Sequence, residues 1–521
     1  MISPRWCIAR MLRLRWVRGT RTDLADQGRD PGSIPVRTAT EVVCRGPMAS
    51  RDVSATMPQI VGAVMPPQSS LQDQQGEQAG PKLLQNGSPS GWVEMAGAFD
   101  NIHPGLTHEE ALRLLALPVD QLESQSDPYM AAAHLINFPC PETEQALITL
   151  VLDGDQSQPR RLARRKAVEV LGRLDCQDSI PAIGRCLSSD DCYLVENAAF
   201  ALQLLRCQDS KILADLSHLL IKSEQNQRVL IQALAALNVS GSLKKIEALL
   251  KSEDHGVRGA AISAMASLGG QRQHLPGLAD QMLLPNQMDR QSAIQDAINA
   301  HAVELLPKIL RAPVSPVFRM RALKVLWPLG CSECEGLKLI AAVDGILLDC
   351  AESLELVHEY DQAPSDDFLV QEFFGTDFSR SYLALGYLQK RSPDLLWPLL
   401  EKRWNEEAHN DYGAHYFFIR LFGLISQWPD SALPRIEEIL LEAIATQRPQ
   451  FMKSKPAAIL SMASLGLITD ASAWGAWLDP QSTPFWESRY AAAMVAPREF
   501  LDVAREDPNP FVAARADFAE S

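Results

Sequence analysis

The stretch Leu171-Gly-Arg-Leu-Asp-Cys-Gln-Asp-Ser179 returns, one unit further along the chain, as Leu202-Gln-Leu-Leu-Arg-Cys-Gln-Asp-Ser210. Apolar positions continue in the same register at Leu174, Leu205, Leu237 and Leu268. Each unit holds two segments of helical apolar spacing with a polar break between them, and no segment alternates as a strand would. A two-helix unit repeated at this interval is typical of an α-solenoid.

Arginine recurs at nearly the same interval, at Arg228, Arg258, Arg290 and Arg321. We interpret these arginines as a structural ladder, in which each guanidinium group pairs with carboxylates or carbonyls of the neighbouring repeat. The sequence therefore predicts an all-α fold, an α-solenoid of HEAT-like helix pairs with a period of about 31 residues.

The first hundred residues differ in composition from the repeats. Residues 1–51 contain ten arginines, no lysine and four acidic residues. This segment is a transit-like leader, a nucleic-acid arm or, in the interpretation we favour, the product of a start assigned too far upstream. Residues 52–97 are rich in Gln, Pro, Ser and Gly and are expected to be disordered. Helical order then begins with a capping box in which Thr107 is the N-cap and Glu110 the third helical residue.

A second change of composition interrupts the array. Residues 351–378 hold eight acids, no Lys or Arg, and five aromatic residues, and we expect a loop or irregular insert there. The predicted divisions are a basic leader or mis-assigned start (1–51), a disordered linker (52–97), an N-terminal helical cap (98–160), a HEAT-like repeat array (161–350), an acidic aromatic insert (351–378) and C-terminal helical repeats (379–521).

Composition excludes several classes of function. The formal charge of the 521 residues is −15, which argues against a nucleic-acid binder because such proteins need clustered positive charge. No apolar run reaches the roughly 18 residues that span a membrane. The ten cysteines are spread along the chain rather than densely spaced, which favours a reducing cytoplasm.

Motifs for metal binding and for common catalytic machinery are weak. Cys331 and Cys334 form a lone CxxC that lacks a second ligand pair, and the His-Glu pairs at His108 and His358 lie far apart in the chain. No phosphate-binding loop or nucleophile elbow is present. We expect no metal and no cofactor.

A basic cluster opens the repeat array, formed by Arg160, Arg161, Arg164, Arg165 and Lys166. Arginine gives bidentate contacts to carboxylates, so the first three residues are candidates for a clamp on a ligand with carboxylate arms. The alternative is a solvated helix face.

Two acidic and aromatic groups are further candidates. Tyr360 and Asp361 follow His358-Glu359 in the insert, where a group against apolar walls can act as an acid or base. The second group lies on one expected helix and consists of Asp411, Tyr412, His415 and Tyr416. This helix would form the wall of a pocket for a π-system, or else an ordinary aromatic core stripe with an Asp–His pair four residues apart.

Three segments carry a resemblance to a known family: Tyr129-Met-Ala-Ala-Ala-His-Leu-Ile-Asn-Phe-Pro139, Arg164-Arg-Lys-Ala-Val-Glu-Val-Leu-Gly172 and Asp190-Asp-Cys-Tyr-Leu-Val-Glu-Asn-Ala-Ala-Phe200. In these the chain resembles the E/F-type phycobilin lyases of cyanobacteria, which are HEAT-repeat proteins. The resemblance covers roughly residues 98 to 470 and is greatest to the branch that loads phycoerythrobilin onto phycoerythrin α subunits, which includes lyase-isomerases that deliver phycourobilin. Phe200 departs from the Trp that the family would have at this position.

The resemblance implies a reaction of light-harvesting pigment assembly in the phycobilisome. A cysteine thiol of the phycoerythrin α subunit adds to the exocyclic ethylidene of ring A of the linear tetrapyrrole and forms a thioether. Under this resemblance Tyr360 would donate to the lactam and Asp361 would accept the pyrrole N–H or shuttle a proton. The implied bilin-binding residues are Arg160, Arg161, Arg164, Asp411, Tyr412, His415 and Tyr416. A non-catalytic HEAT-repeat chaperone or scaffold for the bilin or the apo-protein is the alternative.

Overall fold

The computed structural model describes residues 36–38, 103, 105–222, 224–329 and 338–518. The predicted leader (1–51) and linker (52–97) therefore lie outside the described residues, except for three positions. Cys331 and Cys334 also lie outside them. Among the described residues, no helix is long and apolar enough to cross a membrane.

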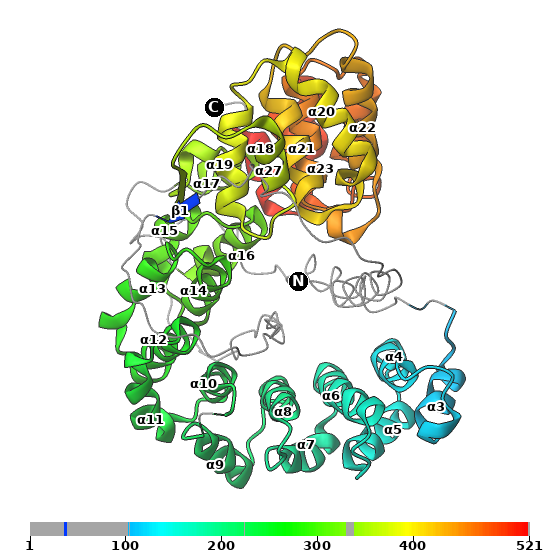
Figure 1. Cartoon of the computed structure of the whole chain (residues 1–521), viewed down its shortest axis with the longest axis vertical. Helices are drawn as coiled ribbons and strands as arrows, with labels where there is room; N and C mark the ends of the chain where they lie inside the picture. The colour runs from blue at the N-terminus through cyan, green and yellow to red at the C-terminus, as the bar shows by residue number, and fades with distance from the viewer. Residues whose placement is uncertain (1–35, 39–102, 104, 223, 330–337, 519–521) are drawn as a thin grey trace, which may run out of the picture.

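The described chain is a curved array of helix pairs (Figure 1). It begins with α3 (His108–Ala116), α4 (Asp127–His134), α5 (Pro141–Leu152), α6 (Gln158–Arg173), α7 (Ile180–Cys186), α8 (Cys192–Leu204), α9 (Ser210–Leu219), α10 (Gln227–Ala236), α11 (Leu243–Ala248), α12 (His255–Gly269), α13 (Pro276–Gln281), α14 (Gln287–Asn299), α15 (Leu306–Arg311) and α16 (Pro316–Leu326). Figure 1 shows α6, α8 and α10 on the inner side of the arc and α7, α9 and α11 on the outer side. The predicted α-solenoid of HEAT-like helix pairs is confirmed.

The arc ends in a second block of helices, which faces the α3–α5 end across the hollow (Figure 1). Its helices are α17 (Leu339–Leu348), α18 (Asp366–Glu372), α19 (Phe378–Leu388), α20 (Pro393–Glu406), α21 (Tyr412–Leu424), α22 (Leu433–Ala445), α23 (Ser454–Ser464), α24 (Ser472–Leu478), α25 (Trp486–Val495), α26 (Leu501–Arg505) and α27 (Pro510–Phe518). Helix α18 lies in the segment where we expected a loop. The segment expected to be a loop or irregular insert therefore contains a short helix, and Leu369 and Val370 of α18 are fully buried in the core of this block.

The only strands in the described residues are two short ones. β2 (His358–Tyr360) pairs antiparallel with β1 (Val36–Thr38), in a register that sets Val36 opposite Tyr360. Three residues of the segment that we expected to stand apart from the fold thus pair with the insert.

The repeat has a backbone signature at its loops. Asp191, Asn226 and Asp254 cap α8, α10 and α12, with side-chain oxygens that accept backbone N–H groups. After the inner helices, the chain turns through a residue with positive φ, at Asp175, Arg206, Asn238, Gly270 and His301. These turns recur at the spacing of the repeated leucines, so the period predicted from the sequence is the period of the turn.

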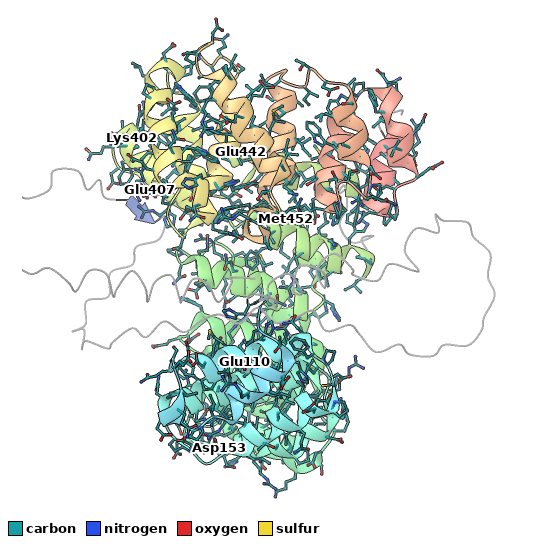
Figure 2. The ribbon with its side chains drawn as sticks, turned by 90° about the vertical axis from the view of Figure 1, so that its right-hand side faces the viewer. Glu110, Asp153, Lys402, Glu407, Glu442 and Met452 are labelled. Carbon is teal, nitrogen blue, oxygen red and sulfur yellow. The ribbon has the colours of Figure 1, made fainter. Side chains whose placement is uncertain are left out.

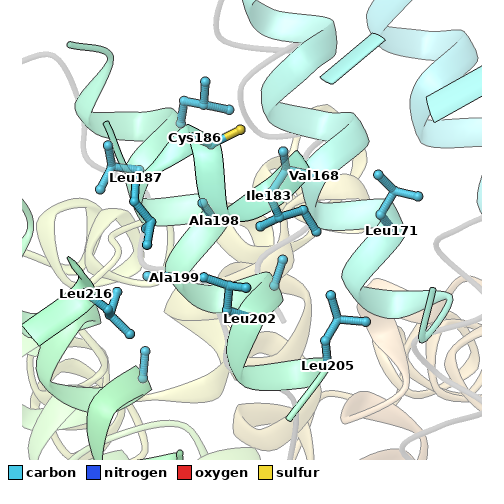
Figure 3. Packing of buried hydrophobic residues seen from close by; sticks show 14 of the residues in the cluster. Val168, Leu171, Ile183, Cys186, Leu187, Ala198, Ala199, Leu202, Leu205 and Leu216 are labelled. Atoms are coloured by element: carbon cyan, nitrogen blue, oxygen red, sulfur yellow. The ribbon is translucent and has the colours of Figure 1, made fainter. Parts of the chain in front are cut away.

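The inner helices pack closely on one another. Leu171 of α6 and Leu202 of α8, which are equivalent in the repeat, are both fully buried in one core (Figure 3). Gly172 makes this approach possible, since a Cβ at that position would lie 2.9 Å from the Cα of Ala201.

The predicted contact with the neighbouring repeat is confirmed at Arg228, whereas Arg258 and Arg290 donate to carbonyls of the loop that precedes their own helix. Arg228 holds the Asp296 carboxylate with N–O distances of 2.7 and 2.9 Å. Arg258 donates to the Ser252 carbonyl, and Arg290 donates to the carbonyls of the two residues at positions 284 and 285. These contacts satisfy carbonyls that the ends of helices leave without partners.

Candidate functional site

The insert forms one wall of the candidate site. His358 is buried, and its Nε2 lies 3.1 Å from an Asp377 carboxylate oxygen. Asp377 also caps α19 and receives a hydrogen bond from Arg290 of the repeat array. Burial alone would raise the pKa of Asp377, but the hydrogen bond with His358 and the charge of Arg290 lower it. The insert is thus bound to the array through the half-buried carboxylate of Asp377.

Tyr360 lies two residues after His358 on β2. Its ring is half-buried between Phe368 and Tyr387, at centroid distances of 5.8 and 5.4 Å. The hydroxyl oxygen is buried and has no hydrogen-bond partner. Burial and the nearby Glu372 raise the pKa of Tyr360 well above its ordinary value, so the phenol stays protonated at neutral pH. The next residue, Asp361, is exposed.

Helix α21 forms the second wall. Asp411 is its N-cap and accepts the N–H groups of Gly413 and Ala414 at 2.9 Å each. Burial raises the pKa of Asp411. Asp411 and Tyr412 are half-buried, and burial raises the pKa of Tyr412 to about 12. These two residues are therefore partly accessible at the start of α21.

His415 and Tyr416 lie deeper than a contact with a ligand requires. His415 is 5% exposed, stacks on Phe451 at 4.1 Å and lies 2.9 Å from the Ser454 hydroxyl. Burial and the charge of Lys453 lower the pKa of His415 to about 3, so its imidazole is neutral. Tyr416 is 2% exposed and donates to Asp349 at 2.5 Å. Both side chains therefore support the wall from inside the core.

Asp349 is the centre of a buried network that the sequence did not indicate. It is the C-cap of α17 with a positive φ of 43°, and it receives hydrogen bonds from Tyr382, Tyr416 and Arg319. Asp349, Arg319 and Tyr382 are all essentially without exposure. Ion pairs at this depth need several hydrogen bonds to offset desolvation, and this network supplies them.

Lys453 was also missed. It precedes α23, is 8% exposed, and its Nζ lies over the rings of Tyr412, Phe378 and Tyr416 at 3.5, 4.7 and 5.2 Å. The segment Phe451-Met-Lys-Ser-Lys455 has no apolar periodicity that would mark this lysine as buried. No sequence signal could therefore have placed it among aromatic rings.

The insert and the start of α21 pack against each other. Asp377, the partner of His358, is followed by Phe378, whose ring lies beside Lys453. The turn at residues 373–375 packs on the start of α21, since a Cβ at Gly413 would lie 2.9 Å from the Phe373 carbonyl oxygen. Figure 2 shows Met452, next to Lys453, at the edge of the second block that faces the hollow of the arc.

The basic cluster is engaged by the protein itself. Arg160 donates to the carbonyls of Leu115 and Leu117 at 2.6 Å each, and Arg164 donates to those of Asp153 and Asp155. Both side chains are buried and tie α3 and the α5–α6 loop to α6. Arg161 is more exposed and lies 3.5 Å from Asp191. A ligand carboxylate would have to displace backbone carbonyls from Arg160 and Arg164, which makes both poor candidates for the predicted clamp.

Among the described residues, no group of three or more His, Cys, Asp or Glu side chains is arranged to hold a metal ion. The polar groups at the candidate site are a phenol, carboxylates and one buried amine.

Comparison with known proteins defines the class. The chain is 45% identical over 370 residues to the bilin biosynthesis protein CpeY of Synechococcus sp. (strain WH8020), a match that covers 71% of this chain and 88% of that protein. It is 34% identical over 404 residues to the uncharacterized phycocyanin operon protein Y of Pseudanabaena tenuis (strain PCC 7409), covering 75% and 91%. No protein-family model matches.

The fold and these relatives define a helical-repeat protein of bilin metabolism. The chain belongs to the E/F-type phycobilin lyase family. Among solved structures, the complex of CpcE and CpcF of phycocyanin lyase from Nostoc sp. PCC7120 is similar at 24% identity and a TM-score of 0.39, over 47% of this chain and 94% of that chain.

Proposed function

We propose that this protein attaches phycoerythrobilin to a cysteine of a phycoerythrin α subunit through a thioether bond. The name and the 45% identity of the CpeY relative support a role in bilin attachment. The observation that carries the chemistry is the hydroxyl of Tyr360, which is buried without a partner beside the exposed Asp361.

The reaction needs a proton at ring A. The client thiol loses its proton and its sulfur adds to the exocyclic carbon of the ethylidene group, while the ring carbon at the other end of that double bond gains a proton. Tyr360 is the proposed donor, because its hydroxyl has no hydrogen-bond partner of its own and is protonated at neutral pH. Asp361 accepts the thiol proton or the pyrrole N–H. Most of the rate comes from holding the thiol and the bilin together.

The test is co-expression of the full chain with phycoerythrobilin and an apo-phycoerythrin α subunit, followed by absorbance of the denatured client. We expect covalent phycoerythrobilin with the wild-type chain. Tyr360→Phe and Asp361→Asn should each reduce attachment about 100-fold or more, the usual contribution of a general acid or base. Glu359→Gln changes an exposed neighbour on the same strand and serves as the matched control.

The spectrum of the product separates the variants of the proposal. A client that carries the shorter-wavelength phycourobilin would make this protein a lyase-isomerase. The absence of covalent pigment above a control without enzyme would refute the lyase and favour the non-catalytic scaffold. Wild-type attachment by Tyr360→Phe would refute the role of its hydroxyl.

A further inference from the structure

Lys453 carries a buried amine that the proposed chemistry does not use. Its Nζ has no hydrogen-bond partner and is buried under the rings of Tyr412, Phe378 and Tyr416. An ammonium group carries three donors, and leaving all of them without acceptors in a buried site is costly. Aromatic faces offset part of this cost through cation–π attraction but accept no conventional hydrogen bond.

The nearest carboxylates are already committed elsewhere. Asp411 accepts two backbone N–H groups at the start of α21. Asp349 is surrounded by Tyr382, Tyr416 and Arg319. Both carboxylates attract the Lys453 amine, yet neither is hydrogen-bonded to it. Among the described residues, none provides a hydrogen-bond acceptor for this amine.

We propose that Lys453 binds a carboxylate of the substrate, namely a propionate arm of the linear tetrapyrrole, with Tyr412 as the ring against which the bilin lies. This assignment rests on the proposed function and adds the anchor for the substrate. The lysine stem is long and flexible, so Nζ reaches the margin at Tyr412 by rotation of its own side chain. Met452 places this segment at the edge of the hollow, where a client subunit would approach (Figure 2).

The surrounding groups determine how binding depends on pH. They are Asp411, Tyr412, His415 and Tyr416 of α21, Asp349 at the end of α17, Arg319 of α16, Tyr382 of α19, and Arg448 of the segment that precedes Lys453. Burial lowers the pKa of Lys453 to about 7, whereas the pKa of His415 is about 3 and that of Tyr412 about 12. A change in the affinity for the bilin between pH 6 and 8.5 is therefore expected to reflect the titration of the Lys453 amine.

The experiment is titration of phycoerythrobilin into the full-length protein without client, followed by bilin absorbance from pH 6 to 8.5. The propionate dimethyl ester of the same bilin is the second probe. The affinity of the wild type for the free acid should be constant below about pH 7 and should fall above it by up to about tenfold per pH unit, since the paired form needs the protonated amine. Lys453→Met should weaken binding at pH 6.5 by about 10- to 100-fold and remove this pH dependence.

Two controls separate a lost contact from a damaged fold. Lys453→Arg keeps a charge that does not titrate, so it should bind the free acid with an affinity that is flat over this range. Lys455→Met removes another buried lysine of the same segment, one that contacts none of the rings that surround Lys453, and should behave as the wild type. The ester should bind the wild type as weakly as the free acid binds Lys453→Met.

Each other outcome overturns the assignment. Wild-type affinity and pH profile in Lys453→Met, or equal affinity of acid and ester for the wild type, would show that the amine does not hold a propionate. If these results occur while Tyr360→Phe still abolishes attachment, the proposed function stands without this anchor. If the wild type binds no phycoerythrobilin at all, both fall.

Discussion

At the scale of single residues, the site is built from groups whose ordinary behaviour is changed by burial. The phenol of Tyr360 is held protonated, the imidazole of His415 is held neutral, and the amine of Lys453 is held close to its titration point. In each case burial is the largest cause, because a charge in a poorly solvated place is disfavoured. Such groups are more common in functional sites than in ordinary cores.

His415 makes the protein sensitive to acid. Its pKa is about 3 in the folded protein and about 6.5 when unfolded. The contribution of the neutral imidazole to the free energy of unfolding is therefore fully present above pH 6.5 and is lost as the pH falls below it. At about 1.4 kcal/mol per pH unit, roughly 2 kcal/mol should be lost between pH 6.5 and 5.

Urea unfolding at pH 7.5 and pH 5 measures this loss. His415→Gln keeps a hydrogen-bonding group beside Ser454 but cannot titrate. The difference in the free energy of unfolding between pH 7.5 and pH 5 should therefore be smaller in this variant, by the roughly 2 kcal/mol assigned to His415. An unchanged loss in this variant would show that another group is responsible.

At the scale of elements, the turns after the inner helices determine where each repeat ends. Gly270 adopts the left-handed conformation without strain, whereas His301 adopts it at the equivalent turn with a side chain. The repeat is thus maintained at His301 despite the backbone strain of a left-handed residue that carries a side chain.

The two turns predict opposite effects. Gly270→Ala should destabilise the protein by about 1 kcal/mol, although a Cβ there would meet nothing within 4 Å, because the cost lies in the backbone. His301→Gly should stabilise it by about 0.5 kcal/mol, since the strain of a left-handed side-chain residue exceeds the entropy that glycine loses. Thermal unfolding of both variants checks the signs. Stabilisation by Gly270→Ala would contradict the assignment of left-handed backbone.

At the scale of the whole molecule, the arc is held by contacts that pass over an entire helix. Arg228 of α10 reaches Asp296 of α14 across α12, and Gly259 of α12 makes room, since a Cβ there would lie 2.6 Å from the Asp296 carboxylate. Asp296 has no exposure, so its charge depends on this arginine. We therefore expect this ion pair to contribute to the curvature of the arc seen in Figure 1.

Removal of this arginine should change both stability and shape. Arg228→Met leaves a buried carboxylate unpaired, at a cost of about 3–5 kcal/mol, and should increase the radius of gyration measured by small-angle X-ray scattering. Arg272→Met breaks an exposed pair with Glu304 and should cost less than about 1 kcal/mol without a change of shape. Equal effects of the two variants would refute a special role for the buried pair.

Much of this could be predicted from the sequence because the relevant signals are local. The repeat period and the N-cap at Thr107 depend on spacing along the chain, and the structure confirms them, as it does the contact of Arg228 with the neighbouring repeat. Asp411, which we placed on the same helix as His415, is instead the N-cap that precedes it, and the His415 side chain contacts Ser454 rather than Asp411. Helix α18 was missed because acidic and aromatic residues masked a short buried helical face.

The solenoid and its family follow from the sequence alone, since each helix pair repeats the same local pattern and stacks on the next. The site, in contrast, depends on tertiary packing. This packing turned His415 and Tyr416 into the core, bound Arg160 and Arg164 to backbone carbonyls, and gathered Asp349, Tyr382 and Lys453 from separate helices. These contacts join residues far apart in the chain. Which distant residues come into contact depends on the rotation between successive helix pairs. The spacing of residues along the chain does not determine this rotation.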